Sequence, residues 1–438
     1  MVILRRCTLL ILLLAVVLPA LEREPWEVFQ QRRRQVAEKH SDGVTILFGY
    51  GEEEGLATRS AFRQENNFYY LTGCNEPGAA LLLLPQDSER PYREILFLPR
   101  RNTARERWTG PRIGPSDDDA RAQTGFMQVR ESDRLAESLR EGLQDDRRLY
   151  ALLPQAPSHG HLPEPDSVAR LKKIVPEMTP ADLRSALRGL RLIKSAGEIR
   201  LIQKAVDATV AGHEAAWRNI QAGAFEYQVM SRMLGEIFNR GCLRAAYPPI
   251  VASGVNSTIL HYSSNASPLR ENEVILMDVG GEYANYAADI TRTLPVSGRF
   301  TQRQREVYNA VLGAQKAALQ AVKPGMRFGG RGPTSLTQIA KDYLDTHGKD
   351  LQGNPLGSYL PHLIGHQVGL EVHDPDTAGA ELQPGMVITI EPGVYLPEEG
   401  FGIRIEDMVL VTEQGSRLLS GDLPREIADI EERMRTAR

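Results

Sequence analysis

Two carboxylates interrupt apolar segments in the second half of the chain. Asp278 ends the apolar run 275–277, and Asp289 begins the next strand-like segment, 290–293. A hairpin over the residues between them would bring the two carboxylates together. An ionised carboxylate inside a half-buried strand is costly unless it is paired or binds a metal. Taken alone, the two residues could also be surface aspartates at strand ends.

A second segment repeats this pattern. Glu391 ends the strand-like segment 388–390, and a glycine follows two residues later, as it does after Asp278. The next strand-like segment brings Arg404 and Glu406, which share a face because side chains in a strand alternate with period two. The repeat predicts two similar half-domains, an internal duplication.

Histidines gather between the two acidic segments. The chain has nine histidines, and three of them, His362, His366 and His373, lie close together among glycines and apolar residues. A lone histidine is more often structural, but this clustering favours chemistry. With the four carboxylates, His366 would complete an oxygen-rich set that suits Mn²⁺, Co²⁺, Fe²⁺ or Zn²⁺. Four acidic groups at one point would repel one another without about two dications to neutralise them.

The composition of the chain sets limits but names no function. Its 438 residues predict two or three domains, and 42% hydrophobic with 25% charged residues is typical of a globular protein. These values exclude a disordered, collagen-like or wholly membrane-embedded chain. A net charge of −4 gives no support for nucleic-acid binding. Three cysteines cannot form a disulfide framework, and we expect Cys74 and Cys242 to be buried thiols.

The first residues have the pattern of a secretory signal. Arg5 and Arg6 precede the uncharged run 7–18, and the small residue Ala20 follows. The run is shorter than the ~20 residues of a membrane-spanning helix. We expect a signal peptide over residues 1–21, export to the periplasm or medium, and no stable membrane span after processing. The alternatives are an uncleaved membrane anchor or a start codon further along the chain. If the segment is not a signal, the protein is cytoplasmic.

The remaining chain divides into two parts. Residues 24–175 alternate helix-like and strand-like segments, which predicts a smaller α/β domain, and the proline-rich stretch 154–166 indicates a loop near its end. Residues 176–438 combine helices with mostly antiparallel strand pairs, which predicts an α+β domain. In this second part we expect helices over 180–220, 224–240, 303–322 and 423–436, and strands within 247–262, 273–281, 287–295, 386–395 and 403–412. The glycine-rich run 325–332 is expected to be a surface turn before a further helix.

Together these segments resemble the pita-bread metallopeptidases, which include methionine aminopeptidase, prolidase and aminopeptidase P. The match to the two-domain aminopeptidase P branch is close and covers nearly all of residues 25–430. The resemblance implies a pseudo-twofold catalytic domain, with a curved antiparallel sheet and outer helices. The matching segments are 62–73, 75–77, 190–195, 253–257, 261–262, 277–280, 362–373, 391–395 and 402–407.

The resemblance also implies a role for each site residue. Asp278 chelates one metal, Asp289 and Glu406 bridge both metals, and His366 and Glu391 hold the other. The metals are two divalent ions, Mn²⁺ before Co²⁺, Zn²⁺ or Fe²⁺. Glu391 resembles the residue that shuttles the proton of the attacking water.

Further residues correspond to positions that face the substrate. His261 and His373 resemble histidines that contact the substrate and steady the tetrahedral intermediate. His362, Tyr395 and Arg404 line or brace the pocket, although Arg404 could be purely structural. Trp108 resembles a tryptophan that approaches the site of a neighbouring subunit, with an ordinary packed tryptophan as the alternative.

The implied reaction is hydrolysis of the bond between an N-terminal residue and a following proline. In this branch the smaller domain restricts entry to the active site, so that only short, unfolded N-termini reach it. It also contributes to a homo-oligomer, a dimer or a tetramer. Prolidase, which takes only Xaa-Pro dipeptides, is the alternative enzyme. A non-catalytic pita-bread peptide-binding module is the alternative of another class, but such modules lack the ligand set. The short loops 374–385 and 396–402 depart from some relatives and could alter which substrates fit.

Overall fold

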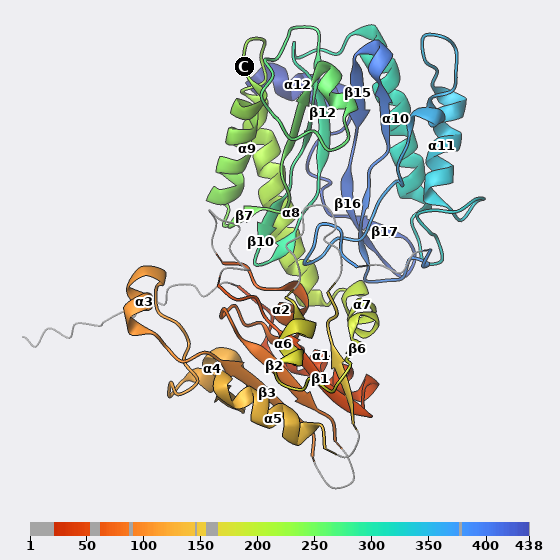
Figure 1. Cartoon of the computed structure of the whole chain (residues 1–438). Helices are drawn as coiled ribbons and strands as arrows, with labels where there is room; N and C mark the ends of the chain where they lie inside the picture. Colours follow the sequence, from red (N-terminus) through yellow and green to blue (C-terminus); the bar gives the residue numbers. More distant parts are fainter. Residues whose placement is uncertain are drawn as a thin grey trace, which may run out of the picture.

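The computed structural model describes residues 22–52, 62–86, 91–144, 147–154, 165–375 and 379–437. The expected signal peptide, residues 1–21, and most of the predicted loop 154–166 lie outside the described residues. Two bodies are stacked end to end, a smaller one built from the first part of the chain and a larger one built from the rest (Figure 1).

The smaller body is a six-stranded mixed sheet with short helices, as the α/β pattern predicts. Its strand order is β4-β3-β2-β1-β5-β6, with antiparallel pairing of β2 to both neighbours and parallel pairing elsewhere. Both faces of β1 are covered, because Val44 and Ile46 join one apolar cluster and Leu47 the other. The strands are β1 (Gly43–Phe48), β2 (Ala80–Leu84), β3 (Arg93–Leu98), β4 (Val129–Glu131), β5 (Arg148–Ala151) and β6 (Ala181–Asp182). The helices are α1 (Trp26–Lys39), α2 (Asn66–Thr72), α3 (Thr103–Thr109), α4 (Ala120–Thr124), α5 (Leu135–Gly142) and α6 (Ser167–Lys172).

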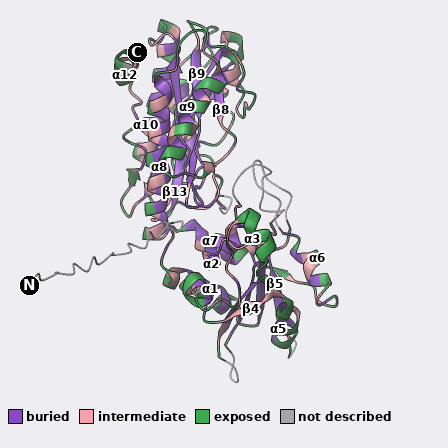
Figure 2. Ribbon diagram, turned by 90° about the vertical axis from the view of Figure 1, so that its left-hand side faces the viewer, coloured by how far each residue is buried: buried purple, intermediate pink, exposed green. Residues whose placement is uncertain are grey.

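The larger body has antiparallel strands between outer helices. In Figure 1, α8 and α9 lie on one side of the strands, and α10 and α11 on the other. Figure 2 shows that the strands are buried and that the helices are exposed on their outer faces. The helices are α7 (Arg184–Leu192), α8 (Ala196–Trp217), α9 (Glu226–Asn239), α10 (Gln302–Ala321), α11 (Leu336–His347) and α12 (Ile427–Ala437). The strands are β7 (Arg244–Ala245), β8 (Ile250–Ser253), β9 (Val274–Asp278), β10 (Gly281–Tyr283), β11 (Tyr286–Ala287), β12 (Thr291–Pro295), β13 (Val387–Ile390), β14 (Gly393–Leu396), β15 (Phe401–Arg404), β16 (Asp407–Val411) and β17 (Ser416–Leu418).

Two strand pairs carry the acidic segments. β9 pairs with β12, where Asp278 lies opposite Thr291, and β13 pairs with β16, where Ile390 lies opposite Asp407. Both pairs are antiparallel, so each brings one carboxylate to the end of a buried strand and another to the segment beside it. The hairpin predicted between Asp278 and Asp289 is therefore present, with β10 and β11 in its connection, and β14 and β15 lie in the connection of the second pair.

The range 180–220 is mostly helical, as predicted, and is divided into α7 and α8 because Ser195 accepts a hydrogen bond from the backbone N–H of Glu198 and begins α8. One predicted segment differs from the structure. The range 247–262 holds one short strand, β8, followed by a 3-10 turn over Gly254–Thr258 instead of a second strand. The glycine-rich run 325–332 precedes α11 as expected.

The two bodies share a continuous interface. Apolar side chains of α2, α7 and α8 belong to one buried cluster, which includes Phe68, Leu187 and Ile202. The free thiols Cys74 and Cys242 are both buried, as predicted. None of the helices within the described ranges combines the length and the apolar character that a membrane crossing requires.

Candidate active site

The predicted metal ligands come together at the ends of the two strand pairs. Nε2 of His366 lies 3.3 Å from Oδ2 of Asp289 and 3.4 Å from Oε1 of Glu391. Ligand atoms of Asp289, His366 and Glu406 all lie within 4.8 Å of one another. Asp278 joins them through the hydroxyl of Tyr247, which is 2.6 Å from Oδ1 of Asp278 and 2.6 Å from Oδ1 of Asp289. The structure thus gathers all five residues into one cluster.

The cluster carries more negative charge than the chain itself can neutralise. Burial and the neighbouring Asp278 raise the pKa of Asp289 to about 6, and burial with repulsion from Asp289 raises the pKa of Glu406 well above its usual range. Burial alone would lower the pKa of His366, but the hydrogen bond with Asp289 and the charge of Glu391 raise it to about 9. Crowded carboxylates whose mutual repulsion raises their pKa values fit a divalent metal site, because bound cations would offset that repulsion.

Hydrogen bonds from neighbouring side chains hold the ligands in place. Thr291 donates to Glu406 at 2.7 Å, and Thr389 donates to Glu391 at 3.3 Å. Nδ1 of His366 lies 3.0 Å from the carbonyl oxygen of its neighbour Gln367, which leaves Nε2 directed at the carboxylates. Such outer contacts fix the orientation of metal ligands in proteins.

A chain of hydrogen bonds leads from the cluster toward its opening. Arg404 donates to Oδ2 of Asp278 at 2.6 Å and to the hydroxyl of Tyr395 at 2.8 Å. That hydroxyl lies 2.9 Å from Nε2 of His362, whose Nδ1 faces the carbonyl of Leu363 at 2.8 Å. Burial lowers the pKa of His362, so the neutral ring donates from Nδ1 and accepts at Nε2. Arg404 therefore braces a carboxylate and organises the lining at once.

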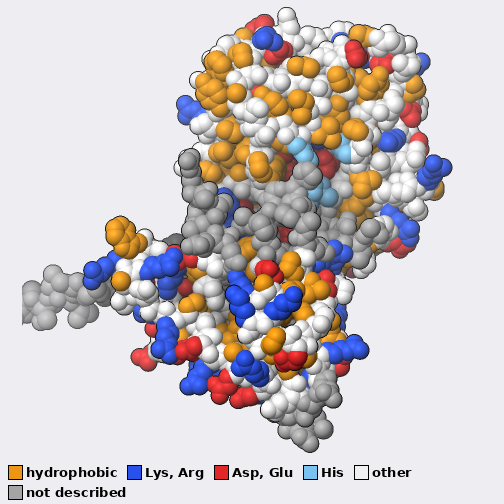
Figure 3. Space-filling view, viewed as in Figure 1, with side chains coloured by type: hydrophobic (Ala, Val, Ile, Leu, Met, Phe, Trp, Pro, Cys, Tyr) orange, Lys and Arg blue, Asp and Glu red, His pale blue; other side chains and the backbone are white. Residues whose placement is uncertain are grey.

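Two further predicted histidines are exposed beside the cluster. The ring of His373 lies 4.0 Å from the ring of His366, centroid to centroid, and its side chain faces solvent, as does that of His261. Figure 3 shows histidine and acidic side chains together on one face of the larger body. Both histidines are placed where a bound molecule could meet them.

Trp108 is the predicted site residue that a single chain does not bring to the cluster. It lies in α3, which projects from the side of the smaller body (Figure 1). Its side chain is 89% exposed, so it is not an ordinary packed tryptophan within the chain.

The sequence reasoning did not single out Tyr247, Thr291 or Thr389. Each contacts a ligand from a segment distant in sequence or from the middle of an ordinary strand. Residue type and spacing therefore give no indication of these contacts.

A mixed α and β fold around a cluster of four carboxylates and one histidine is typical of metal-dependent hydrolases. Two family descriptions match the chain, "Metallopeptidase family M24" over residues 200–413 and "Aminopeptidase P, N-terminal domain" over residues 29–150. The chain belongs to metallopeptidase family M24, in its aminopeptidase P branch, and is a hydrolase.

Curated relatives align with this chain over most of their own length. The Xaa-Pro aminopeptidase of Haemophilus influenzae is 38% identical, over 94% of this chain and 97% of the relative. Xaa-Pro aminopeptidase 3 of Homo sapiens is 37% identical, over 85% of this chain and 76% of the relative.

Solved structures of aminopeptidase P have the same architecture. The low-pH form of the Escherichia coli enzyme is 30% identical, with a TM-score of 0.82 over 95% of this chain and 100% of that one. Proline aminopeptidase P II of Yersinia pestis is 31% identical, with a TM-score of 0.79 over 94% of this chain and 100% of that one. The predicted pita-bread domain behind a smaller α/β domain is confirmed.

Proposed function

We propose that this protein is an aminopeptidase that removes the first residue from peptides with proline in the second position. The observation that carries the proposal is the complete cluster of Asp278, Asp289, His366, Glu391 and Glu406 behind a smaller domain of the aminopeptidase P type. Curated relatives named Xaa-Pro aminopeptidase support the substrate class. A 29% identical structure of Escherichia coli aminopeptidase P is described with the inhibitor Pro-Leu.

The proposed cofactor is a pair of divalent cations, Mn²⁺ before Co²⁺, Zn²⁺ or Fe²⁺, held by these five residues. Bound there, the cations would supply an activated water and a polarised scissile carbonyl. Metal ligands bind in their deprotonated forms, so cations and protons compete for the cluster, and the raised pKa of His366 strengthens that competition.

The chain's own residues orient the substrate and move the proton. Glu391, steadied by Thr389, is the proposed general base and then the acid for the leaving proline nitrogen. His261 and His373, exposed at the opening, would donate hydrogen bonds to the developing oxyanion. Tyr395 and His362 line the approach, and Arg404 pairs with Asp278 and holds its carboxylate in position.

The organisation of the chain follows the same proposal. We propose the two domains predicted over 24–175 and 176–438, with the boundary moved past β6 (Ala181–Asp182), because β6 pairs with β5 in the sheet of the smaller body. We also propose that residues 1–21 direct export and that the enzyme works as a dimer or tetramer on peptides.

A peptide panel tests the proposed activity. The metal-stripped protein should be inactive on a tripeptide Xaa-Pro-Yaa and should recover on addition of Mn²⁺, Co²⁺ or Zn²⁺. Asp289→Ala should remain inactive with every metal. Hydrolysis of the dipeptide Xaa-Pro alone would make the protein a prolidase, and unchanged hydrolysis by metal-stripped Asp289→Ala would refute the proposed mechanism.

A further inference from the structure

The loop 367–374 is a closed turn that connects two histidines of the site. His366 immediately precedes it, and His373 is its penultimate residue. The backbone N–H of Asp374 donates to the carbonyl of Gln367 at 2.9 Å, which closes the turn. A Cβ on Gly369 would lie 2.7 Å from the Asp374 carboxylate, so that carboxylate packs directly on the turn. The position of Asp374 therefore fixes the shape of the loop.

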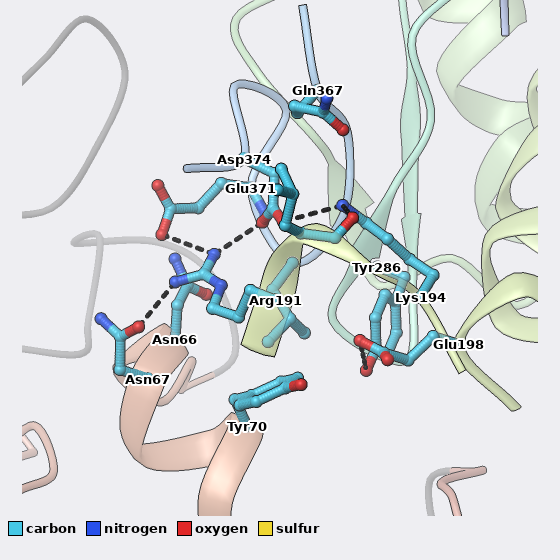
Figure 4. A network of polar contacts seen from close by, with 12 residues as sticks. Asn66, Asn67, Tyr70, Arg191, Lys194, Glu198, Tyr286, Gln367, Glu371 and Asp374 are labelled. Atoms are coloured by element: carbon cyan, nitrogen blue, oxygen red, sulfur yellow. Dashed lines mark hydrogen bonds and ion pairs between the residues drawn. The ribbon is translucent and has the colours of Figure 1, made fainter. Parts of the chain in front are cut away.

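Two buried cations hold the Asp374 carboxylate. Arg191 donates to Oδ1 at 2.6 Å, and Lys194 donates to Oδ2 at 3.1 Å, with all three side chains no more than 2% exposed. Arg191 also contacts Glu371 of the same loop at 2.9 Å (Figure 4). Removing either partner of such a pair leaves a buried charge without compensation.

The smaller domain reaches the same loop directly through Arg63 and indirectly through Arg191. Asn67, in α2, accepts a hydrogen bond from Arg191 at 2.8 Å (Figure 4). Arg63, just before α2, donates to the backbone carbonyl of Leu370 at 2.7 Å and pairs with Glu282 at 2.7 Å. The loop is thus held from one side by Arg191 and from the other by Arg63.

The closure of the loop also orients His366. The carbonyl of Gln367 accepts from Asp374 N–H at 2.9 Å and faces Nδ1 of His366 at 3.0 Å. A fixed carbonyl holds Nδ1 and so directs Nε2 at the cluster, which is how such contacts orient a metal-binding histidine. His373, one residue before Asp374, moves with the same turn.

We propose that Arg63 and Arg191 are positioning residues that make the orientation of His366 and His373 depend on docking of the smaller domain. Only the kinetic consequence rests on the proposed function. The structural coupling stands on the contacts alone.

Hydrogen exchange in the metal-free, full-length protein tests the coupling. The variants are Arg63→Gln, which removes the charge paired with Glu282 and the guanidinium that donates to Leu370, and Arg191→Lys, which keeps the charge but loses the planar fork. Both should speed exchange of the Gly369 and Asp374 amides by about 10-fold or more, because the hydrogen bonds that protect them open more often. The control is Arg130→Lys, which alters the contact between Arg130 and Ser138, linking β4 to α5 of the smaller domain, and should leave exchange in the loop unchanged.

Kinetics supply the second readout. With saturating metal, both variants should lower kcat about 10-fold to 100-fold with a smaller change in KM, and Arg63→Lys should recover part of the loss. Loop exchange equal to wild type in folded Arg63→Gln and Arg191→Lys would overturn the coupling. If the wild type cleaved no Xaa-Pro peptide, the proposed function would fail, yet the exchange data would still decide the coupling.

Discussion

Arg404 lies between a metal-cluster carboxylate and the opening, and its guanidinium contacts both Asp278 and Tyr395. Lysine would keep the charge but could not make both contacts at once. We expect Arg404→Lys to lower kcat/KM about 10-fold to 100-fold. Steady-state kinetics on a tripeptide with proline second measure this change. Arg100→Lys, at an exposed ion pair of the smaller domain, should retain wild-type activity. Equal kinetics of the two variants would contradict the role given to Arg404.

His213 gives the protein a pH-dependent stability. Its side chain is fully buried in α8, Nε2 bonds the carbonyl of Ile290 at 3.0 Å, and burial together with Arg292 lowers its pKa from 6.5 to about 4. The unfolded chain therefore takes up a proton below about pH 6.5 that the folded protein refuses until about pH 4. The stabilisation is complete above the unfolded pKa and is lost as the pH falls toward the folded one.

Urea unfolding measures this effect. Between about pH 7 and about pH 5, His213 should cost the wild type about 2 kcal/mol of unfolding free energy. His213→Gln keeps a donor for Ile290 but does not titrate, so its loss over the same interval should be smaller by about that amount. The same pH dependence in both proteins would rule out His213 as the source.

The metal ligands could be predicted from the sequence, but the side chains that hydrogen-bond to them could not, and the reason is physical. Asp278, Glu391 and the histidine cluster stand out because charge in an apolar strand is costly and demands a partner. Tyr247 contacts Asp278 and Asp289, and Thr291 contacts Glu406, but an isolated tyrosine or a strand threonine is ordinary in any fold. Only the tertiary structure shows that they face the cluster.

At the scale of elements, the first residue of α9 organises the loop that carries His261. Glu226 is fully buried, and its two carboxylate oxygens accept hydrogen bonds from residues of the segment 253–267, which includes His261. The donors are the backbone and hydroxyl of Ser253 at 2.7 and 2.8 Å, Asn256 at 3.1 Å, the Tyr262 hydroxyl at 2.9 Å and the Ser267 backbone at 2.9 Å. This carboxylate explains why 247–262 is a short strand with a turn, since the polar side chains turn inward to Glu226.

Replacing that carboxylate should disturb both stability and catalysis. In Glu226→Gln one acceptor becomes a donor that faces other donors, which should cost about 1–3 kcal/mol. The displaced loop should also lower kcat/KM through His261. Thermal unfolding and kinetics check the two effects. Glu236→Gln, at a partly exposed ion pair of the same helix, should change stability by no more than about 0.5 kcal/mol. Wild-type stability of Glu226→Gln would show that the hydrogen bonds are not needed.

The long elements were predictable and several short ones were not. Helices α8 and α10 show a sustained helical period, and the strands that carry Asp278 and Glu391 are apolar runs of strand length. α2 and α3 are seven residues each, too short to show a period, and they are fixed at their first turns by the side chains of Glu65 and Asn102. Such caps are visible in a sequence only when the helix behind them is already expected.

At the scale of the whole molecule, α3 presents one large apolar side chain, Trp108, that the single chain leaves uncovered. No residue of α3 is buried, and Trp108 is 89% exposed. A tryptophan carries a large apolar area, and exposed aromatic anchors of this kind are typical of protein interfaces. The proposed homo-oligomer would cover it with a second copy.

Sedimentation of one variant protein tests whether Trp108 lies at an interface between copies of the chain. Trp108→Ala should weaken self-association by about 2 kcal/mol or more, roughly 30-fold in Kd, because an interface anchor is lost. Its thermal unfolding at high dilution should match wild type, since Trp108 packs against little within the chain. Trp108→Phe keeps most of the aromatic surface and should associate more tightly than the alanine variant. If Trp108→Ala sedimented as wild type over the whole concentration range, α3 would not contribute to an interface between copies, and the exposed tryptophan would need another partner.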